Sequence, residues 1–289
     1  YDRSQPRCNK SINGTAFVAP HWGEVDYENG WIYVIDNNEA GNAGSVTDLL
    51  FRFDEFTELE QNAQILTLDI TTMGTDIPYA SQIALTDSSG LYLAHQDGST
   101  LFYFPNVEDF STYITDSLII TPYVAGLTVS GAGDVIWSVA QTNVSDSNIQ
   151  KSSTIMDNSA VLNFTGAVIT QGSAINELTG PTRLFTDSNY LYISDTGDSI
   201  NAVDPFYNHR IVRYDLAGTN PVSYGAVGSG IGQFDFPVLM GLLPDNKLYI
   251  LDMGNDRIVC IDADSFDGTG WEEFAAGVDL IYFLDSPGV

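Results

Sequence analysis

The chain has 289 residues, of which 44% are hydrophobic, and its 38 acidic residues against ten Lys and Arg give a formal net charge of −28. Such a surface repels phosphate backbones, and no apolar run reaches the roughly 18 residues of a membrane helix, so neither nucleic-acid binding nor a membrane span is expected. We interpret the charge as solubility in salty or extracellular surroundings, with cation binding as the alternative. The 15 Tyr and 15 Phe favour strands.

Taken in order, the chain shows five similar units. Each is opened by a proline just ahead of an apolar run: Pro20, Pro78, Pro122, Pro181 and Pro237. After a turn rich in Gly, Asn and Asp comes a second run with a central aromatic residue, and these second runs read WIYVID, LYLAH, VIWSVA, LYISD and LYILD. Third runs follow at residues 49–53, 101–104, 152–156, 211–214 and 258–261. With fourth, less regular runs, this repeat of about 45 to 60 residues predicts an all-β fold, a β-propeller of four-stranded antiparallel blades.

The number of blades depends on how the end of the chain is divided. A single domain of residues 1–289 is expected, with blades near 20–77, 78–121, 122–180, 181–236 and 237–270. Residues 271–276 and 280–285 match the first two strands of a further blade, which is 271–289 completed by the amino-terminal arm, 1–19. We therefore favour six blades, with a closing blade shared between the two termini. In the alternative, residues 280–284 form the outer strand of blade five, and the propeller has five blades.

Units four and five carry a specific resemblance. The residues are Asp195 and Asn208-His209-Arg210 in unit four, and Asp252 and Asn255-Asp256-Arg257 in unit five. Together with the proline and the second strand, they resemble the NHL repeat, a β-propeller repeat; units one to three keep the strands and lose the triplet. We expect the Asp that ends the second strand to be bridged by the Asn and Arg that open the third. His209 is then predicted to be a structural turn residue.

The resemblance also raises the question of catalysis, because lyases with NHL-like propellers place His, Asp, Glu and a metal around the central channel. The first strands of this chain offer Glu24, Asp26, Gln82 and Arg183, and no histidine inside any of them. Three scattered histidines are little material for a His-ligated metal centre. The sequence therefore nominates no catalytic and no cofactor-binding residue, and a non-enzymatic role is favoured.

Calcium is the one cation that the sequence suggests. Asp262, Asp264 and Asp267 lie in a loop that continues into Gly268. Oxygen-rich loops of this kind suit a hard cation, although the third carboxylate comes one position late for an EF-hand. The alternative is an acidic, solvent-exposed turn.

Two features bear on an extracellular location. The two cysteines, Cys8 and Cys260, are predicted to form a disulfide that ties the amino-terminal arm to a late strand; the alternative is two unrelated thiols. Four N-x-S/T sequences are candidate glycan sites: Asn9, Asn13, Asn143 and Asn163.

These observations favour a secreted or cell-surface β-propeller that serves as a non-catalytic binding or structural module. Protein or carbohydrate partners are expected to contact loops of one face, with residues 37–47, 143–151 and 196–207 as the natural candidates. A first alternative is a metal-dependent lyase or hydrolase at the mouth of the channel. A second is the subunit of an extracellular polymer, assembled when an exposed edge accepts a strand from a neighbour.

Overall fold

The computed structural model describes residues 11–12, 15–16, 20–26, 30–36, 49–54, 64–67, 80–86, 90–95, 101–106, 114–116, 124–139, 148–152, 164–171, 174–196, 208–243 and 245–276. Within these ranges the secondary structure is β, apart from one 3-10 turn at Met253–Asn255. No described helix is long and apolar enough to cross a membrane. The expectation of an all-β fold is confirmed.

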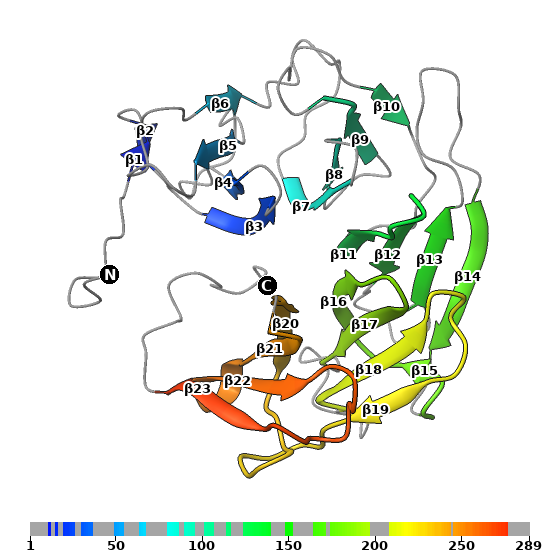
Figure 1. The fold of residues 1–289 in the computed structure, drawn as a ribbon. Helices are drawn as coiled ribbons and strands as arrows, with labels where there is room; N and C mark the ends of the chain where they lie inside the picture. The colour runs from blue at the N-terminus through cyan, green and yellow to red at the C-terminus, as the bar shows by residue number, and fades with distance from the viewer. Residues whose placement is uncertain are drawn as a thin grey trace.

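Five sheets follow one another along the described chain, and Figure 1 shows them set around a central axis. We call them blades one to five, and each runs in chain order from an inner to an outer strand. Blade one is β3 (Pro20–Asp26), β4 (Trp31–Asp36), β5 (Leu49–Asp54) and β6 (Gln64–Thr67). Blade two is β7 (Ala80–Leu85), β8 (Leu91–His95), β9 (Leu101–Phe104) and β10 (Ile114–Asp116).

The later blades follow the same order. Blade three is β11 (Val124–Val129), β12 (Val135–Val139), β13 (Asn148–Ser152), β14 (Phe164–Gln171) and the short parallel β15 (Glu177–Leu178). Blade four is β16 (Pro181–Thr186), β17 (Tyr190–Asp195), β18 (Arg210–Asp215) and β19 (Val222–Tyr224). Blade five is β20 (Pro237–Leu242), β21 (Lys247–Asp252), β22 (Arg257–Asp262) and β23 (Glu272–Ala276).

The inner strands line the axis. Neighbours in the series β3, β7, β11, β16 and β20 contact each other. Each inner strand contains a register irregularity against its second strand, which bends it where the sheets converge. The approach between β11 and β16 is close, because a Cβ at Gly126 would lie only 2.1 Å from the carbonyl oxygen of Thr182. A glycine is therefore required at this contact.

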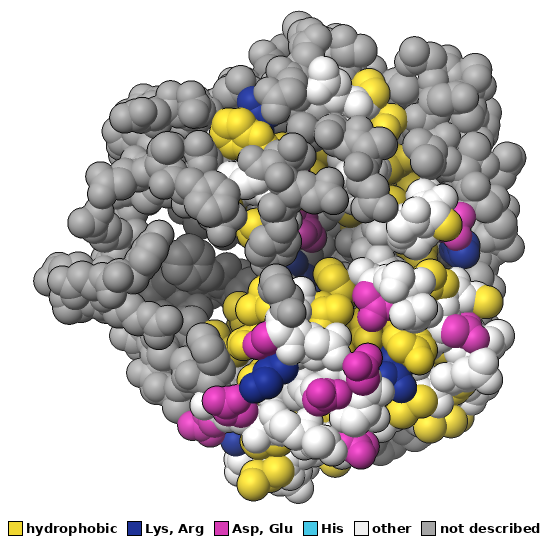
Figure 2. Space-filling view, viewed as in Figure 1, with side chains coloured by type: hydrophobic (Ala, Val, Ile, Leu, Met, Phe, Trp, Pro, Cys, Tyr) yellow, Lys and Arg dark blue, Asp and Glu magenta, His cyan; other side chains and the backbone are white. Residues whose placement is uncertain are grey.

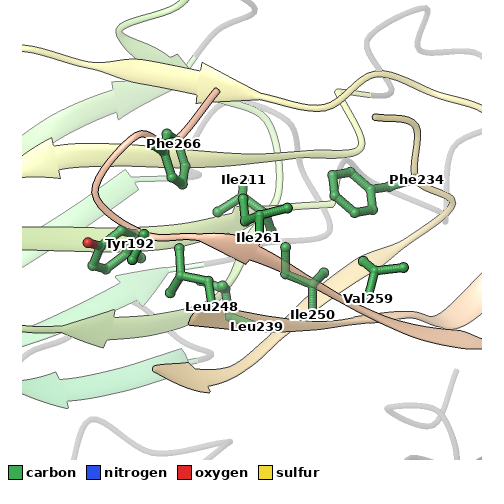
Figure 3. Packing of buried hydrophobic residues seen from close by; sticks show 10 residues of the cluster. Tyr192, Ile211, Phe234, Leu239, Leu248, Ile250, Val259, Ile261 and Phe266 are labelled. Atoms are coloured by element: carbon green, nitrogen blue, oxygen red, sulfur yellow. The ribbon is translucent and has the colours of Figure 1, made fainter. Parts of the chain in front are cut away.

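The hydrophobic core lies between successive blades rather than at the axis. Figure 3 shows the cluster between blades four and five, where Tyr192 and Ile211 meet Ile250 and Ile261. Similar buried clusters join blades one and two, two and three, and three and four. Blades two, three and four thus bury both faces against their neighbours, which explains why their second and third strands read as largely apolar runs.

The end of the described chain corrects one sequence-based boundary. Residues 271–276 were expected to open a sixth blade, and the five-blade alternative placed residues 280–284 at the edge of blade five. Instead, β23 pairs antiparallel with β22 and is the fourth strand of blade five. The physical reason is local: the connection between the two strands is short, and Trp271 packs against the core of blade five.

The closing blade stays a prediction. Residues 277–289 lie outside the described ranges, as does most of the amino-terminal arm. Within that arm, β1 (Ser11–Ile12) and β2 (Thr15–Ala16) form a two-stranded hairpin. The proposed sharing of a blade between the termini is therefore neither supported nor contradicted.

Candidate functional site

A buried carboxylate organises one end of blade four. Asp195 ends β17 and has no solvent exposure. Its Oδ2 accepts hydrogen bonds from Asn208 Nδ2 at 2.8 Å and from Arg210 Nε at 2.9 Å. Its Oδ1 accepts the backbone N–H groups of Thr179 and Gly180 at 2.8 and 3.0 Å. One side chain thus ties the start of the third strand to the segment that leads into the inner strand.

Blade five repeats this arrangement. Asp252 is also fully buried, and its Oδ2 accepts hydrogen bonds from Asn255 Nδ2 at 2.9 Å and Arg257 Nε at 2.8 Å. Its Oδ1 accepts the backbone N–H of Asp235 at 2.6 Å. The bridge expected from the sequence is confirmed in both units. We call each set of Asp, Asn and Arg a clamp.

The two clamp arginines also fix the loops that precede the inner strands. Arg210 Nη2 donates to the carbonyl oxygens of Ala174 and Glu177 at 3.1 and 2.7 Å. The guanidinium of Arg257 donates to three carbonyl oxygens of the equivalent loop, those of Ser229, Gly230 and Gln233. Because a guanidinium presents several donors in a fixed plane, each arginine sets the shape of a whole loop.

His209 lies at a left-handed backbone position, with φ of 35°, and the equivalent Asp256 has φ of 51°. His and Asp are among the residues that tolerate this conformation. The buried imidazole accepts the backbone N–H of Phe236 at Nδ1, over 3.3 Å, and its ring lies 4.6 Å from the ring of Phe236. The geometry agrees with a structural role for His209, which links the clamp of blade four to blade five.

The clamped loops carry large aliphatic side chains into solvent. Ile175 is 52% exposed and Ile231 is 82% exposed. Each of them lies six residues before the proline that opens the inner strand of the next blade. The second loop packs onto the first clamp, because a Cβ at Gly225 would lie 3.3 Å from the Cα of Arg210. Val227 and Met253, also exposed, extend the apolar surface on blade five.

The topology places these groups on one face of the propeller. In an antiparallel blade, the connection from strand two to three and the connection from strand four to the next inner strand emerge on the same face. The clamps belong to the first kind of connection and the loops with Ile175 and Ile231 to the second. We call this surface the clamp face.

The segments expected to contact partners were residues 37–47, 143–151 and 196–207, which follow the second strands of blades one, three and four in the sequence. Most of these residues lie outside the described ranges, and residues 148–151 belong to β13 rather than to a loop. The exposed isoleucines were missed by sequence reasoning. Their signal is the recurrence of an aliphatic residue at one position of a loop where polar residues are the rule.

The predicted calcium loop lies on the opposite face, between β22 and β23. Asp262 Oδ1 accepts the backbone N–H of Ser265 at 2.9 Å, and Asp267 Oδ1 accepts that of Thr269 at 2.8 Å. The bond from the backbone of Ser265 lowers the pKa of Asp262, and bonds from the side chain and backbone of Thr269 lower the pKa of Asp267. These carboxylates stabilise their own turns.

A cationic side chain already occupies the inner side of this loop. Arg213 Nη1 donates to the carbonyl oxygens of Ala263 and Asp264 at 2.7 and 3.1 Å. Its guanidinium lies over the rings of Tyr190 and Phe266. In the part of the chain that the structure describes, no group of three or more His, Cys, Asp or Glu is arranged to hold a metal ion. The three predicted ligands are thus not gathered into a site, and calcium binding stays a prediction.

Among the residues that the structure describes, two inner strands bring a pair of opposite charges together near the axis. Glu24 on β3 and Arg183 on β16 approach to 3.9 Å between Oε1 and Nη2, with side chains 31% and 16% exposed. Figure 2 shows an acidic and a basic side chain near each other close to the centre of the ring. Burial raises the pKa of Glu24 and lowers that of Arg183, and each group opposes the shift of the other. The pair is too long for a hydrogen bond.

Of the residues predicted for a disulfide and for glycan attachment, the structure describes Cys260. Cys260 is buried in β22, where burial raises the pKa of its thiol. Cys8 lies outside the described residues, so the disulfide stays a prediction. The four candidate glycan sites also lie outside them: Asn9, Asn13, Asn143 and Asn163.

Comparison with protein-family models and with curated proteins finds no match. Solved structures do match. A chain of a nidogen/laminin complex aligns over 90% of this chain and 82% of its own length, with 14% identity and a TM-score of 0.58. A streptogramin B lyase aligns over 90% and 70%, with 10% identity and a TM-score of 0.57. A virginiamycin B lyase from Staphylococcus aureus, in a structure with quinupristin, aligns over 91% and 71%, with 11% identity and a TM-score of 0.57. At these identities the likeness concerns the fold, and the chain is a β-propeller.

Proposed function

We propose that this protein is a non-catalytic binding module, secreted or displayed at a cell surface, which holds a protein partner on its clamp face. The observation that carries the proposal is the exposure of Ile175 and Ile231 on loops that buried clamps hold in place. Exposed apolar groups mark interaction sites where they form a larger surface, and Val227 and Met253 add to the exposed apolar groups on the blade-five side. Loops that are already ordered also bind at a lower entropic cost.

Two further points support this function. One solved structure with the same fold belongs to a nidogen/laminin complex, so a chain of this fold takes part in a protein complex. The exposed isoleucines lie on the connections between blades three and four and between blades four and five. A partner therefore meets a surface built from more than one blade, as standard-size interfaces require.

The test compares three forms of the full chain as bait in the culture medium of cells that produce it. They are the wild type, Ile175→Ser/Ile231→Ser, and Val222→Ser, a control exposed on an outer strand. Cross-linking and mass spectrometry are expected to find proteins that the wild type and the control retain and the double variant loses. An identical set of proteins on all three baits, with unchanged circular dichroism, would contradict the proposal. A glycan array with the same proteins tests for a carbohydrate partner.

Residues near the axis suggest a second candidate function, that of a lyase or hydrolase. Glu24 combines a raised pKa with a neighbouring guanidinium, as general acids and bases often do. Two of the similar structures are lyases. Under this proposal Glu24→Gln abolishes turnover of quinupristin, the compound present in one of the similar structures, and Ile175→Ser/Ile231→Ser does not. Turnover that survives Glu24→Gln would exclude this residue.

Assembly into a polymer is the third proposal, and it predicts a mass that grows with concentration. Sedimentation velocity of the wild type measures this directly, and a single species at all concentrations would contradict it.

A further inference from the structure

We infer that the clamp face takes a cationic protein segment that presents aliphatic side chains between its Lys or Arg residues. The inference rests on the proposed function and names the chemistry of its partner. The proposed function was argued from the exposed apolar groups. This inference is argued from a different observation, the charged groups near Ile175 and Ile231.

The basic groups of the clamp face point inward. Arg210 and Arg257 are only 8% and 9% exposed. Their guanidinium N–H groups are directed at the buried carboxylates Asp195 and Asp252 and at loop carbonyl oxygens. Their positive charge is therefore balanced inside the protein, and it contributes little to the potential at the surface.

Acidic groups on the side of the loop that carries Ile231 remain in contact with solvent. The side chain of Asp235 is 41% exposed beside His209, and that of Glu273 is 48% exposed, 3.8 Å from Arg257. Asp256 is exposed at the left-handed position next to Met253. An apolar centre with an acidic rim complements apolar groups that are flanked by positive charge, because each rim carboxylate can pair without being buried.

The chemistry of the exposed apolar groups further restricts the class of molecule that can bind. The large hydrophobic side chains that are exposed among the described residues are all Ile, Val or Met. Within the described surface, the face thus lacks an exposed aromatic ring on which a sugar could stack. With a net charge of −28, the whole protein also steers cationic partners toward itself at low salt.

The experiment separates the local rim from the overall charge. The probes are three fluorescent synthetic helical peptides: one with a Leu stripe flanked by Lys, one in which Glu replaces Lys, and one in which Ser replaces Leu. Anisotropy with the full chain at about 0.15 M salt, where exposed charges are screened beyond roughly 8 Å, is expected to show binding of the first peptide at least about tenfold tighter than the others.

Variants of the protein assign that binding to the clamp face. Ile175→Ser/Ile231→Ser is expected to weaken it about tenfold, and Asp256→Asn/Glu273→Gln about threefold. The matched control is Asp264→Asn/Asp267→Asn, which removes two carboxylates from the opposite face and is expected to leave binding unchanged. Equal weakening by the control, or equal binding of the Ser peptide, would overturn the inference.

The outcomes also distinguish the inference from the function on which it rests. If natural partners depend on the isoleucines and the Lys peptide does not bind, the cationic partner is wrong and the binding face stands. If neither depends on them, both fail.

Discussion

The clamps should contribute a large share of the stability of their blades, and Asp252→Ala tests this most directly. The change removes a carboxylate with no solvent exposure that accepts hydrogen bonds from Asn255, Arg257 and the backbone of Asp235. Arg257, 9% exposed, then loses its buried carboxylate partner and keeps only Glu273, which is 3.8 Å away with a side chain 48% exposed. Asn255 still donates to the carbonyl oxygen of Gly228, so its amide is not left without a partner.

The magnitude follows from the environment of the arginine. Removing one member of a buried ion pair costs about 3 to 5 kcal/mol, because the other charge stays buried. Arg257 keeps its loop carbonyl partners, which satisfy its N–H groups but not its charge. We therefore expect the lower end, about 3 kcal/mol, equivalent to a fall in Tm of about 6 to 10 °C in a domain of this size.

Urea denaturation followed by fluorescence and calorimetry measures both quantities. The control is Glu272→Ala, which breaks the Lys247–Glu272 pair of the same blade, 2.7 Å long and exposed. Exposed pairs add little, so the control is expected to unfold with the wild type. If Asp252→Ala shifts the midpoint no more than Glu272→Ala does, the clamp is not a stabilising element and our interpretation of the repeat is wrong.

Three further predictions concern the channel, the axis and the acidic loop. Because the folded pKa of Glu24 is raised above 4.5, its contribution to stability is fully present below that pH and is lost as pH rises through the folded pKa. The unfolding free energy of the wild type relative to Glu24→Gln should therefore fall as the pH rises above about 4.5; a flat difference would refute the assignment. Gly126→Ala should destabilise by about 2 to 3 kcal/mol in urea, because its Cβ meets backbone, and unchanged stability would refute the close contact. Calorimetric titration should give calcium a dissociation constant no lower than about 0.1 mM for the loop that contains Asp264. A micromolar dissociation constant that is lost in Asp264→Asn would show that the loop rearranges.

The sequence was informative about strands because their signals are local. Proline, turn and aromatic run recur within each unit, and the observed inner and second strands lie at the expected positions. The third strand of blade three was expected at residues 152–156 and lies at Asn148–Ser152, where Ile149 is buried and the mostly polar sequence NIQKS gives a weak apolar signal. The strand that pairs with β23 was predicted wrongly. An apolar run after a turn has the same sequence pattern whether it is the last strand of one blade or the first strand of the next.

The candidate site was predictable to different degrees. The clamps followed from a pattern, since Asp195 and Asp252 stand directly opposite Arg210 and Arg257 in the strand register. The contact of Glu24 with Arg183 could not be predicted, because these residues are far apart in sequence and the bulges of the inner strands interrupt the alternation of side chains. The exposure of Ile231 could not be predicted for a similar reason. An aliphatic residue three positions before Phe234 has the pattern of a core residue unless the fold of the loop is known.

The contact between His209 and Phe236 has a consequence for how the molecule opens. It joins the clamp of blade four to blade five, and two other bonds do the same: Ser194 Oγ accepts the backbone N–H of Leu239 at 2.7 Å, and Arg213 holds the loop after β22. Amides of these two blades should therefore exchange with solvent as one cooperative unit, with a common opening free energy. Blades four and five would then serve as the folded template on which the rest of the ring assembles.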